Sequence, residues 1–149
     1  MRRLLAIAAI ATASVALLPT SSATAATNGY VTQVKVGQHA DFDRIVITFH
    51  GSVPNHDIRY VNAVHRDPSG KDVHLAGHAK LLITVHPTLG DRSQPQGTVK
   101  PHYPEIRVVK GAGNFEGYTS YGVGLAAHEP FHVSTLSSPN RLVIDIDHP

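Results

Sequence analysis

The chain has 149 residues, no cysteine, 11 histidines, and 13 Lys and Arg against 11 Asp and Glu. This length suits a single domain, and the absence of cysteine excludes disulfides, thiol catalysis and a lipid anchor on an N-terminal Cys. Arg2 and Arg3 fall in a predicted export signal, so 11 basic residues remain to balance the 11 acidic ones. The near-neutral remainder lacks the basic excess that nucleic-acid binding requires.

Residues 1–25 are typical of a cleavable secretory signal. Arg2 and Arg3 supply the positive charge, Leu4 to Leu18 carries none, and a small-x-small pattern predicts cleavage between Ala25 and Ala26. The apolar run is shorter than the roughly 20 residues of a membrane-spanning helix. We therefore expect a secreted or extracytoplasmic product, a candidate for cell-wall association, with neither stable membrane insertion nor a lipid anchor.

Apolar and polar residues alternate with a period of two along much of the remaining chain, which is typical of strands that bury one face. The clearest stretches are Arg44–His50, Lys80–His86, Glu105–Val108 and Arg141–Asp147, and weaker ones are Val31–Val36, Asp57–His65 and Phe131–Leu136. Turn signals separate these stretches, and only Val123–His128 is a candidate for one short helix. The pattern predicts an all-β fold, a small antiparallel β-sandwich of two sheets.

The predicted organisation is a signal over residues 1–25, a short linker over 26–30 and the β-sandwich over 31–149. Within the domain, Pro87 to Pro104 holds four prolines and two glycines, which indicates a long surface loop. Such loops are either functional or disordered, and the sequence leaves both alternatives open.

One segment matches a zinc-protease pattern. His128-Glu129-Pro130-Phe131-His132 reads H-E-x-x-H, in which two histidines one helical turn apart bind zinc and the glutamate acts as base. Pro130 disfavours a helix here, and the residues that follow have the pattern of a strand. A loop leading into a strand is the preferred interpretation, and a zinc-dependent hydrolase using His128, Glu129 and His132 is an alternative.

Histidines elsewhere favour a polar surface over a metal site. His74 and His78 share the i, i+4 spacing but flank an expected turn, and a zinc or copper site assembled from several strands stays open as an alternative. No cofactor or metal is expected. Because all 11 histidines lie beyond residue 25, the charge of the domain rises as pH falls through about 6.5.

The segment from Gly111 to Leu125 interleaves five glycines with three aromatic residues, Phe115, Tyr118 and Tyr121. The glycines permit tight turns, and the rings either fill the core or stack on sugar rings. Phe115, Tyr118 and Tyr121 are therefore the candidate ligand-contacting residues. No serine-nucleophile elbow and no evident acid–base pair of carboxylates is present, so no catalytic residue is assigned.

Several of these segments together resemble one family. Val34–Gly37 followed by Phe42–Phe49 is similar to the opening of the AMIN and AMIN-like domains, and Arg141–Ile146 is similar to their final strand. Gly113–Gly117 and Tyr121–Leu125 resemble the AMIN-like branch of actinobacterial secreted proteins and lipoproteins.

The resemblance implies a two-sheet β-sandwich and a targeting role at the cell envelope, with peptidoglycan the usual ligand proposed for AMIN domains. The family offers no catalytic or ligand-binding residues that can be matched to positions in this sequence. We expect the module to stand alone, without an amidase domain, and to lack the lipid anchor of many AMIN-like relatives, because the chain has no Cys. The shared residues also predict Phe42 and Phe49 in the core. Asp43-Arg44 precedes one strand, and Arg141 and Asp145 face outward on another, so we expect an ion pair between these strands, which contributes about 0–1 kcal/mol if it is exposed.

The leading hypothesis is a secreted, non-catalytic binding or targeting module for peptidoglycan, another anionic wall polymer or an envelope protein. A secreted protein–protein interaction or inhibitor module that uses the Pro87–Pro104 loop is a further alternative. The histidines add the expectation that binding to phosphate- or carboxylate-bearing wall polymers is tighter in acid.

Overall fold

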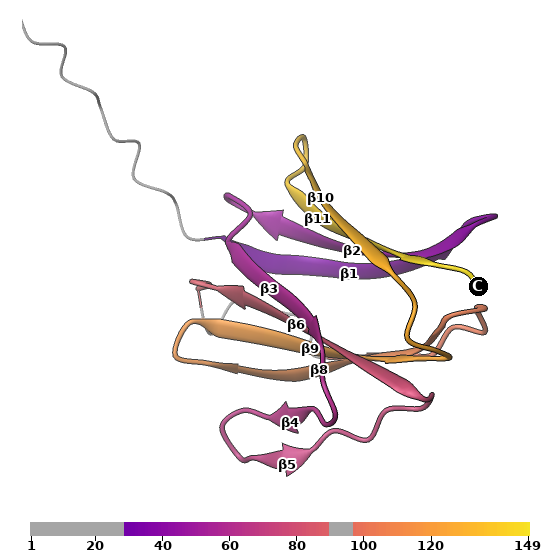
Figure 1. The fold of residues 1–149 in the computed structure, drawn as a ribbon. Helices are drawn as coiled ribbons and strands as arrows, with labels where there is room; N and C mark the ends of the chain where they lie inside the picture. The colour runs from indigo at the N-terminus through magenta and orange to yellow at the C-terminus, as the bar shows by residue number, and fades with distance from the viewer. Residues whose placement is uncertain (1–28, 90–96) are drawn as a thin grey trace, which may run out of the picture.

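A computed structural model describes residues 29–89 and 97–149, which form β-strands joined by turns and loops, without a helix in these two ranges (Figure 1). The predicted signal, the Ala25–Ala26 cleavage site and part of the Pro87–Pro104 loop lie outside the described residues. The strands are β1 (Tyr30–Gln38), β2 (Phe42–His50), β3 (Asn55–Tyr60), β4 (His65–Arg66), β5 (Lys71–Asp72), β6 (Ala79–His86), β7 (Thr98–Val99), β8 (Ile106–Phe115), β9 (Tyr118–Leu125), β10 (Phe131–Leu136) and β11 (Arg141–Asp147).

Two antiparallel sheets lie face to face. One has the strand order β1-β2-β11-β10 and the other β3-β6-β9-β8-β7. Figure 1 shows them as two layers, with the β4–β5 hairpin against the outer face of the second. The predicted all-β sandwich of two sheets is thereby confirmed.

The core between the sheets follows the two-residue periodicity. In β2, Ile45, Ile47 and Phe49 are at most 4% exposed, and the same alternation buries one face of β6 and of β11. Burying one apolar side chain of this size stabilises the fold by about 1.5–3 kcal/mol. The predicted inward faces of these strands are therefore confirmed.

Three details of the sequence prediction were wrong, and one predicted strand is longer than expected. Val123–Leu125 is strand rather than helix, because it ends β9, whose inward side chains are buried in the core. Asp57–His65 is not one strand, since β3 ends at Tyr60. Phe42 is only half-buried, because it stacks on His39 outside the core with centroids 4.4 Å apart. The strand expected near Ile106 runs on to Phe115 and pairs with β9.

The expected ion pair between outward-facing residues of neighbouring strands is present. Arg44 pairs with Asp145 in register, and its Nε and Nη2 donate to the two carboxylate oxygens at 2.6 and 2.7 Å. This hydrogen bond raises the pKa of Arg44. Both side chains are partly exposed, so the pair contributes no more than about 1 kcal/mol.

The connection between β3 and β6 folds back over the outer face of β9 and carries the β4–β5 hairpin. A Cβ on Gly124 would lie 2.0 Å from the carbonyl oxygen of Ala76, and one on Gly122 would lie 3.0 Å from Leu75 and Val64. Two glycines on this face of β9 therefore bring the backbone of the connection onto the sheet. Val64, Val73 and Ala112 form a small second core there.

Candidate ligand-binding site

Three rings, two exposed and one half-buried, lie in a row across the second sheet, on its outer face. Phe115 at the end of β8 pairs in register with Tyr118 at the start of β9. Tyr118 stacks on His86 at the end of β6, with ring centroids 3.9 Å apart and an angle of 17° between the planes. Directly opposed residues of antiparallel strands share one face of the sheet. Phe115, Tyr118 and His86 are called the aromatic row below.

A two-residue turn presents the aromatic row. Glu116 and Gly117 link β8 to β9, both with positive φ, 48° and 79°. Turns of this kind match the twist of the flanking strands and favour glycine. Phe115 and Tyr118 consequently face each other at the tip of the hairpin, 45% and 47% exposed. Large apolar side chains at a rigid tip are available for contact with a ligand.

Tyr121 lies away from the other two candidate residues, on the inner face of β9. Its side chain is 2% exposed and belongs to the main core. Three positions separate Tyr121 from Tyr118, and an odd spacing in a strand places side chains on opposite faces. Burial raises the pKa of the Tyr121 hydroxyl. The structure thus brings Phe115 and Tyr118 together and adds His86, while Tyr121 packs between the sheets.

A second stacked pair lies at the same end of the sandwich. Tyr30 at the start of β1 pairs with His50 at the end of β2, with ring centroids 4.9 Å apart. Backbone contacts tie this end to the aromatic row, because Gly29 bridges to Thr88 and the Thr88 N–H donates to Gly117 at 2.8 Å. Several strands of both sheets therefore end beside the β8–β9 tip (Figure 1).

These groups suit a polyhydroxylated ligand. The electron-rich face of an aromatic ring attracts the weakly positive C–H edge of a pyranose ring, and an imidazole offers a hydrogen-bond donor and acceptor to hydroxyl groups. Protonated histidine also attracts carboxylate and phosphate. The chemistry available at the aromatic row is recognition rather than bond cleavage.

The H-E-x-x-H segment does not form the helical arrangement that the zinc hypothesis requires. His128 lies in the loop after β9 and stacks on Tyr60, with ring centroids 3.6 Å apart. His132 lies on β10 and contacts Asp147, with Nε2 and Oδ2 3.4 Å apart. Pro130 separates a loop from a strand, so the two imidazoles have different partners. Among the described residues, no three metal-binding side chains come together, and His74 and His78 are both exposed.

A buried carboxylate that the sequence analysis did not single out connects the two sheets. Asp43 on β2 is fully buried, and its Oδ2 accepts hydrogen bonds from the backbone N–H groups of Glu105 and Ile106 at 2.8 and 2.9 Å. The neighbouring Glu105 is also buried and accepts from the N–H of Ala127 at 3.2 Å. These partners satisfy Asp43 internally, which indicates a structural role.

The fold is that of a compact all-β module without an assembled reactive centre in the part of the chain that the structure describes. The chain belongs to the AMIN-like domain family, whose family model matches residues 29–148. Comparisons with curated proteins and with solved structures found no match.

Family membership places the protein in a broad functional class. AMIN-like domains are non-catalytic binding modules of the extracytoplasmic cell envelope, associated with the cell wall. Within residues 29–89 and 97–149 there is no helix with the length and hydrophobicity needed to span a bilayer.

Proposed function

We propose that this protein is exported and attaches, without catalysis, to a saccharide polymer of the cell wall through the aromatic row. The observation that carries the proposal is the alignment of Phe115, Tyr118 and His86 on three adjacent strands, with both Phe115 and Tyr118 nearly half exposed. Adjacent strands are about 4.8 Å apart, so the row forms a narrow platform that runs across the sheet. Because Tyr118 and His86 stack face to face, a glycan chain laid along the row meets the edges and polar atoms of these two rings and the exposed Phe115 ring beside them.

The position of the row on strands and a tight turn supports this function. Binding groups held by a rigid scaffold lose little conformational entropy when a ligand docks. Thr88 further anchors the turn, because its hydroxyl donates to the Gly117 carbonyl at 3.1 Å. Core packing does not explain the exposed rings, whereas ligand contact does. Peptidoglycan is the polymer we propose, in keeping with the family.

Co-sedimentation of the purified protein with insoluble cell wall tests the proposal. We expect Tyr118→Ala and Phe115→Ala each to weaken binding by roughly three- to tenfold, in line with about 1 kcal/mol for one exposed ring contact. Leu136→Ala, which removes an equally exposed apolar side chain on β10, is the matched control. Undiminished binding in the Phe115→Ala, Tyr118→Ala double variant would refute the aromatic row as the binding site.

The histidines give this function an expected pH dependence. Wall polymers carry carboxylates and phosphates, and protonation of up to 11 histidines increases the attraction between protein and wall. We expect tighter, salt-sensitive wall binding near about pH 5.5 than near about pH 8. Equal binding at the two pH values would show that histidine charge does not contribute.

Export is part of the proposal and has its own test. Residues 1–25 have the composition of a signal peptide. N-terminal sequencing of the protein recovered from an expressing culture is expected to begin at Ala26. Recovery of the protein with Met1 intact, inside the cells, would contradict export. Crosslinking to a protein of the culture filtrate, with no retention on wall, would instead favour the alternative of a protein-binding module.

A further inference from the structure

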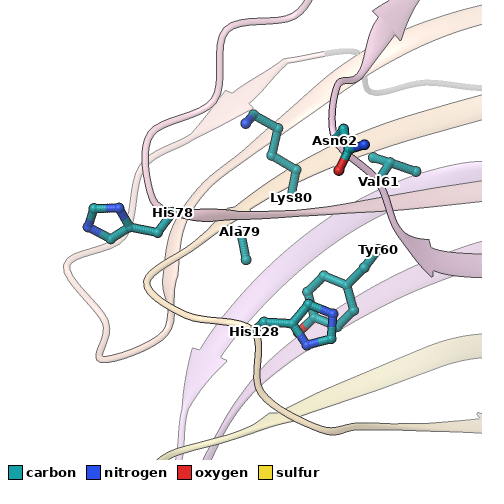
Figure 2. Close-up of a pocket in the computed structure, with 7 residues that line it drawn as sticks. All are labelled: Tyr60, Val61, Asn62, His78, Ala79, Lys80 and His128. Atoms are coloured by element: carbon teal, nitrogen blue, oxygen red, sulfur yellow. The ribbon is translucent and has the colours of Figure 1, made fainter.

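A hollow of about 430 Å³ lies at the opposite end of β6 from the aromatic row. Seven residues from β3, β6 and the segments beside them line it: Tyr60, Val61, Asn62, His78, Ala79, Lys80 and His128 (Figure 2). Small-molecule sites occupy roughly 300–1,000 Å³, so the hollow accommodates a small ligand or one unit of a larger one.

Neighbouring segments hold the wall of the hollow firmly. The Tyr60 hydroxyl donates to the carbonyl oxygen of Glu129 at 2.6 Å, which fixes the loop after β9 against the end of β3. His128 of that loop stacks on the Tyr60 ring, and Figure 2 shows the two rings lying together on one side of the hollow. The N–H of Val61 donates to the Lys80 carbonyl at 2.9 Å and closes the adjoining side.

The lining is basic and polar. Lys80 contributes an ammonium group, His78 and His128 contribute imidazoles, and Asn62 contributes an amide, whereas none of the seven residues is acidic. Figure 2 shows Lys80 and Asn62 on one side of β6 and Ala79 with the Tyr60–His128 pair on the other, while the His78 ring points away from these groups. Donors arranged in this way favour a ligand that carries negative charge.

Two acidic side chains near the hollow have partners of their own. Glu105 is buried and accepts from the N–H of Ala127, and Asp72, in an adjoining hollow, pairs with His65 at 2.8 Å. Burial is the main cause that raises the pKa of Tyr60, and the negative charges of the buried Glu105 and the half-buried Glu129 raise it further. Tyr60 therefore stays a neutral phenol. Lys80 and Asn62 line both this hollow and the adjoining one that contains Asp72, and Lys80 has no ion-pair partner among the described residues.

We propose that this hollow is a second binding site, which takes an oxyanion, a carboxylate or a phosphate, of a small ligand. The Lys80 ammonium and the Asn62 amide donate to the anion, and the rest of the ligand extends past Ala79 to the stacked Tyr60 and His128 rings on the other side of β6. The site lies at the other end of the sheet from the aromatic row, so its existence does not depend on wall binding there.

Titration of the isotope-labelled protein with inorganic phosphate and with acetate, followed by NMR, tests this site. We expect saturable shifts of amide signals at residues 60–62, 78–80 and 128, with sodium chloride at equal ionic strength as the reference. Saturation by phosphate alone or by acetate alone identifies the preferred anion, and either supports the site. Shifts that chloride reproduces, or shifts elsewhere only, would overturn the proposal.

Two variants separate the site from general charge effects. Lys80→Met keeps most of the aliphatic stem and is expected to weaken anion binding at least tenfold. Lys35→Met, which removes an exposed lysine of β1 far from the hollow, is expected to leave it unchanged. An equal loss in both variants would show a nonspecific charge effect and refute the site. Binding unchanged in a folded Lys80→Met protein would refute it as well.

Discussion

The Nε2 atom of His148 lies 3.0 Å from Oδ1 of the buried Asp43, and this contact fastens the end of the chain to the start of β2. The other oxygen of Asp43 accepts two backbone hydrogen bonds where β8 begins. One carboxylate therefore joins the first sheet, the second sheet and the segment after β11. The hydrogen bonds from the two backbone N–H groups to the buried Asp43 carboxylate are worth about 1.5–3 kcal/mol each, so this junction affects the stability of the whole domain.

Replacing the buried carboxylate is expected to destabilise the fold markedly. Asp43→Ala leaves two backbone donors and His148 without their acceptor, and we expect the free energy of unfolding to fall by roughly 3 kcal/mol. Chemical denaturation measures this loss. The control is Asp57→Ala on β3, whose ion pair with Arg59 is exposed and is expected to change stability by less than about 1 kcal/mol. Similar losses in both variants would contradict the role given to Asp43.

The same contact makes stability depend on pH. His148 Nδ1 lies 3.1 Å from the Ala40 carbonyl oxygen, so both ring nitrogens face acceptors and only the protonated ring donates to both. The hydrogen bond to Asp43 raises the pKa of His148. A raised pKa in the folded state stabilises the protein fully below the unfolded value of about 6.5, and this stabilisation is lost as pH rises through the folded value.

Comparison with His148→Ala isolates this effect from the other ten histidines. The difference in denaturation midpoint between the original chain and the variant is expected to be larger at about pH 5.5 than at about pH 8.5. If the difference between the two denaturation midpoints grew with increasing pH, the pKa of His148 would be lowered by folding rather than raised.

Removing the hydroxyl of Tyr121 is expected to stabilise the protein. This oxygen is buried, and no described residue offers it a hydrogen bond. Burial of an unpaired polar group costs about 1–3 kcal/mol, so Tyr121→Phe is expected to raise the melting temperature. Tyr60→Phe makes the same chemical change where the hydroxyl donates to Glu129, and it is expected to lower stability by about 1 kcal/mol. Stability changes of the same sign in Tyr121→Phe and Tyr60→Phe would contradict this account.

A side chain at Gly124 is expected to disrupt the packing of the β4–β5 connection. The Cβ of Gly124→Ala would meet the Ala76 carbonyl at 2.0 Å and a Val108 methyl at 2.9 Å, so the backbone must shift. We expect a loss of about 1–3 kcal/mol in unfolding free energy. Gly37→Ala places its Cβ in open space on β1 and serves as the control. An unchanged unfolding free energy in Gly124→Ala would show that the β3–β6 connection moves away from β9 at little energetic cost.

The two-residue periodicity made most of the core predictable, and it also indicates the burial of Asp43. Asp43 has the same parity as Ile45 and Ile47, which places it on the buried face of β2, and this marked it as a carboxylate in need of internal partners. Its partners near Glu105 lie more than 60 residues away, so no local pattern indicates them. The parity of Tyr118 and Tyr121 likewise separates an exposed ring from a buried one.

The β8–β9 hairpin was hidden for a different reason. Glycine carries no side chain and gives no hydropathy signal, so Gly111–Leu125 has an irregular pattern although it forms the second half of β8 and all of β9, which pair with each other. The hollow was equally invisible, since Tyr60 and Glu129 approach across 69 positions. His86, the third member of the aromatic row, was placed on a strand end, but its stacking partner comes from β9.

Strand β6 carries Lys80 near its first residue and His86 as its last, and it is hydrogen-bonded on both edges, to β3 and to β9. Six residues of extended chain span about 20 Å. The strand therefore holds Lys80 and His86 at a fixed separation. A single extended molecule contacts both residues only when its own binding groups are spaced at the same interval.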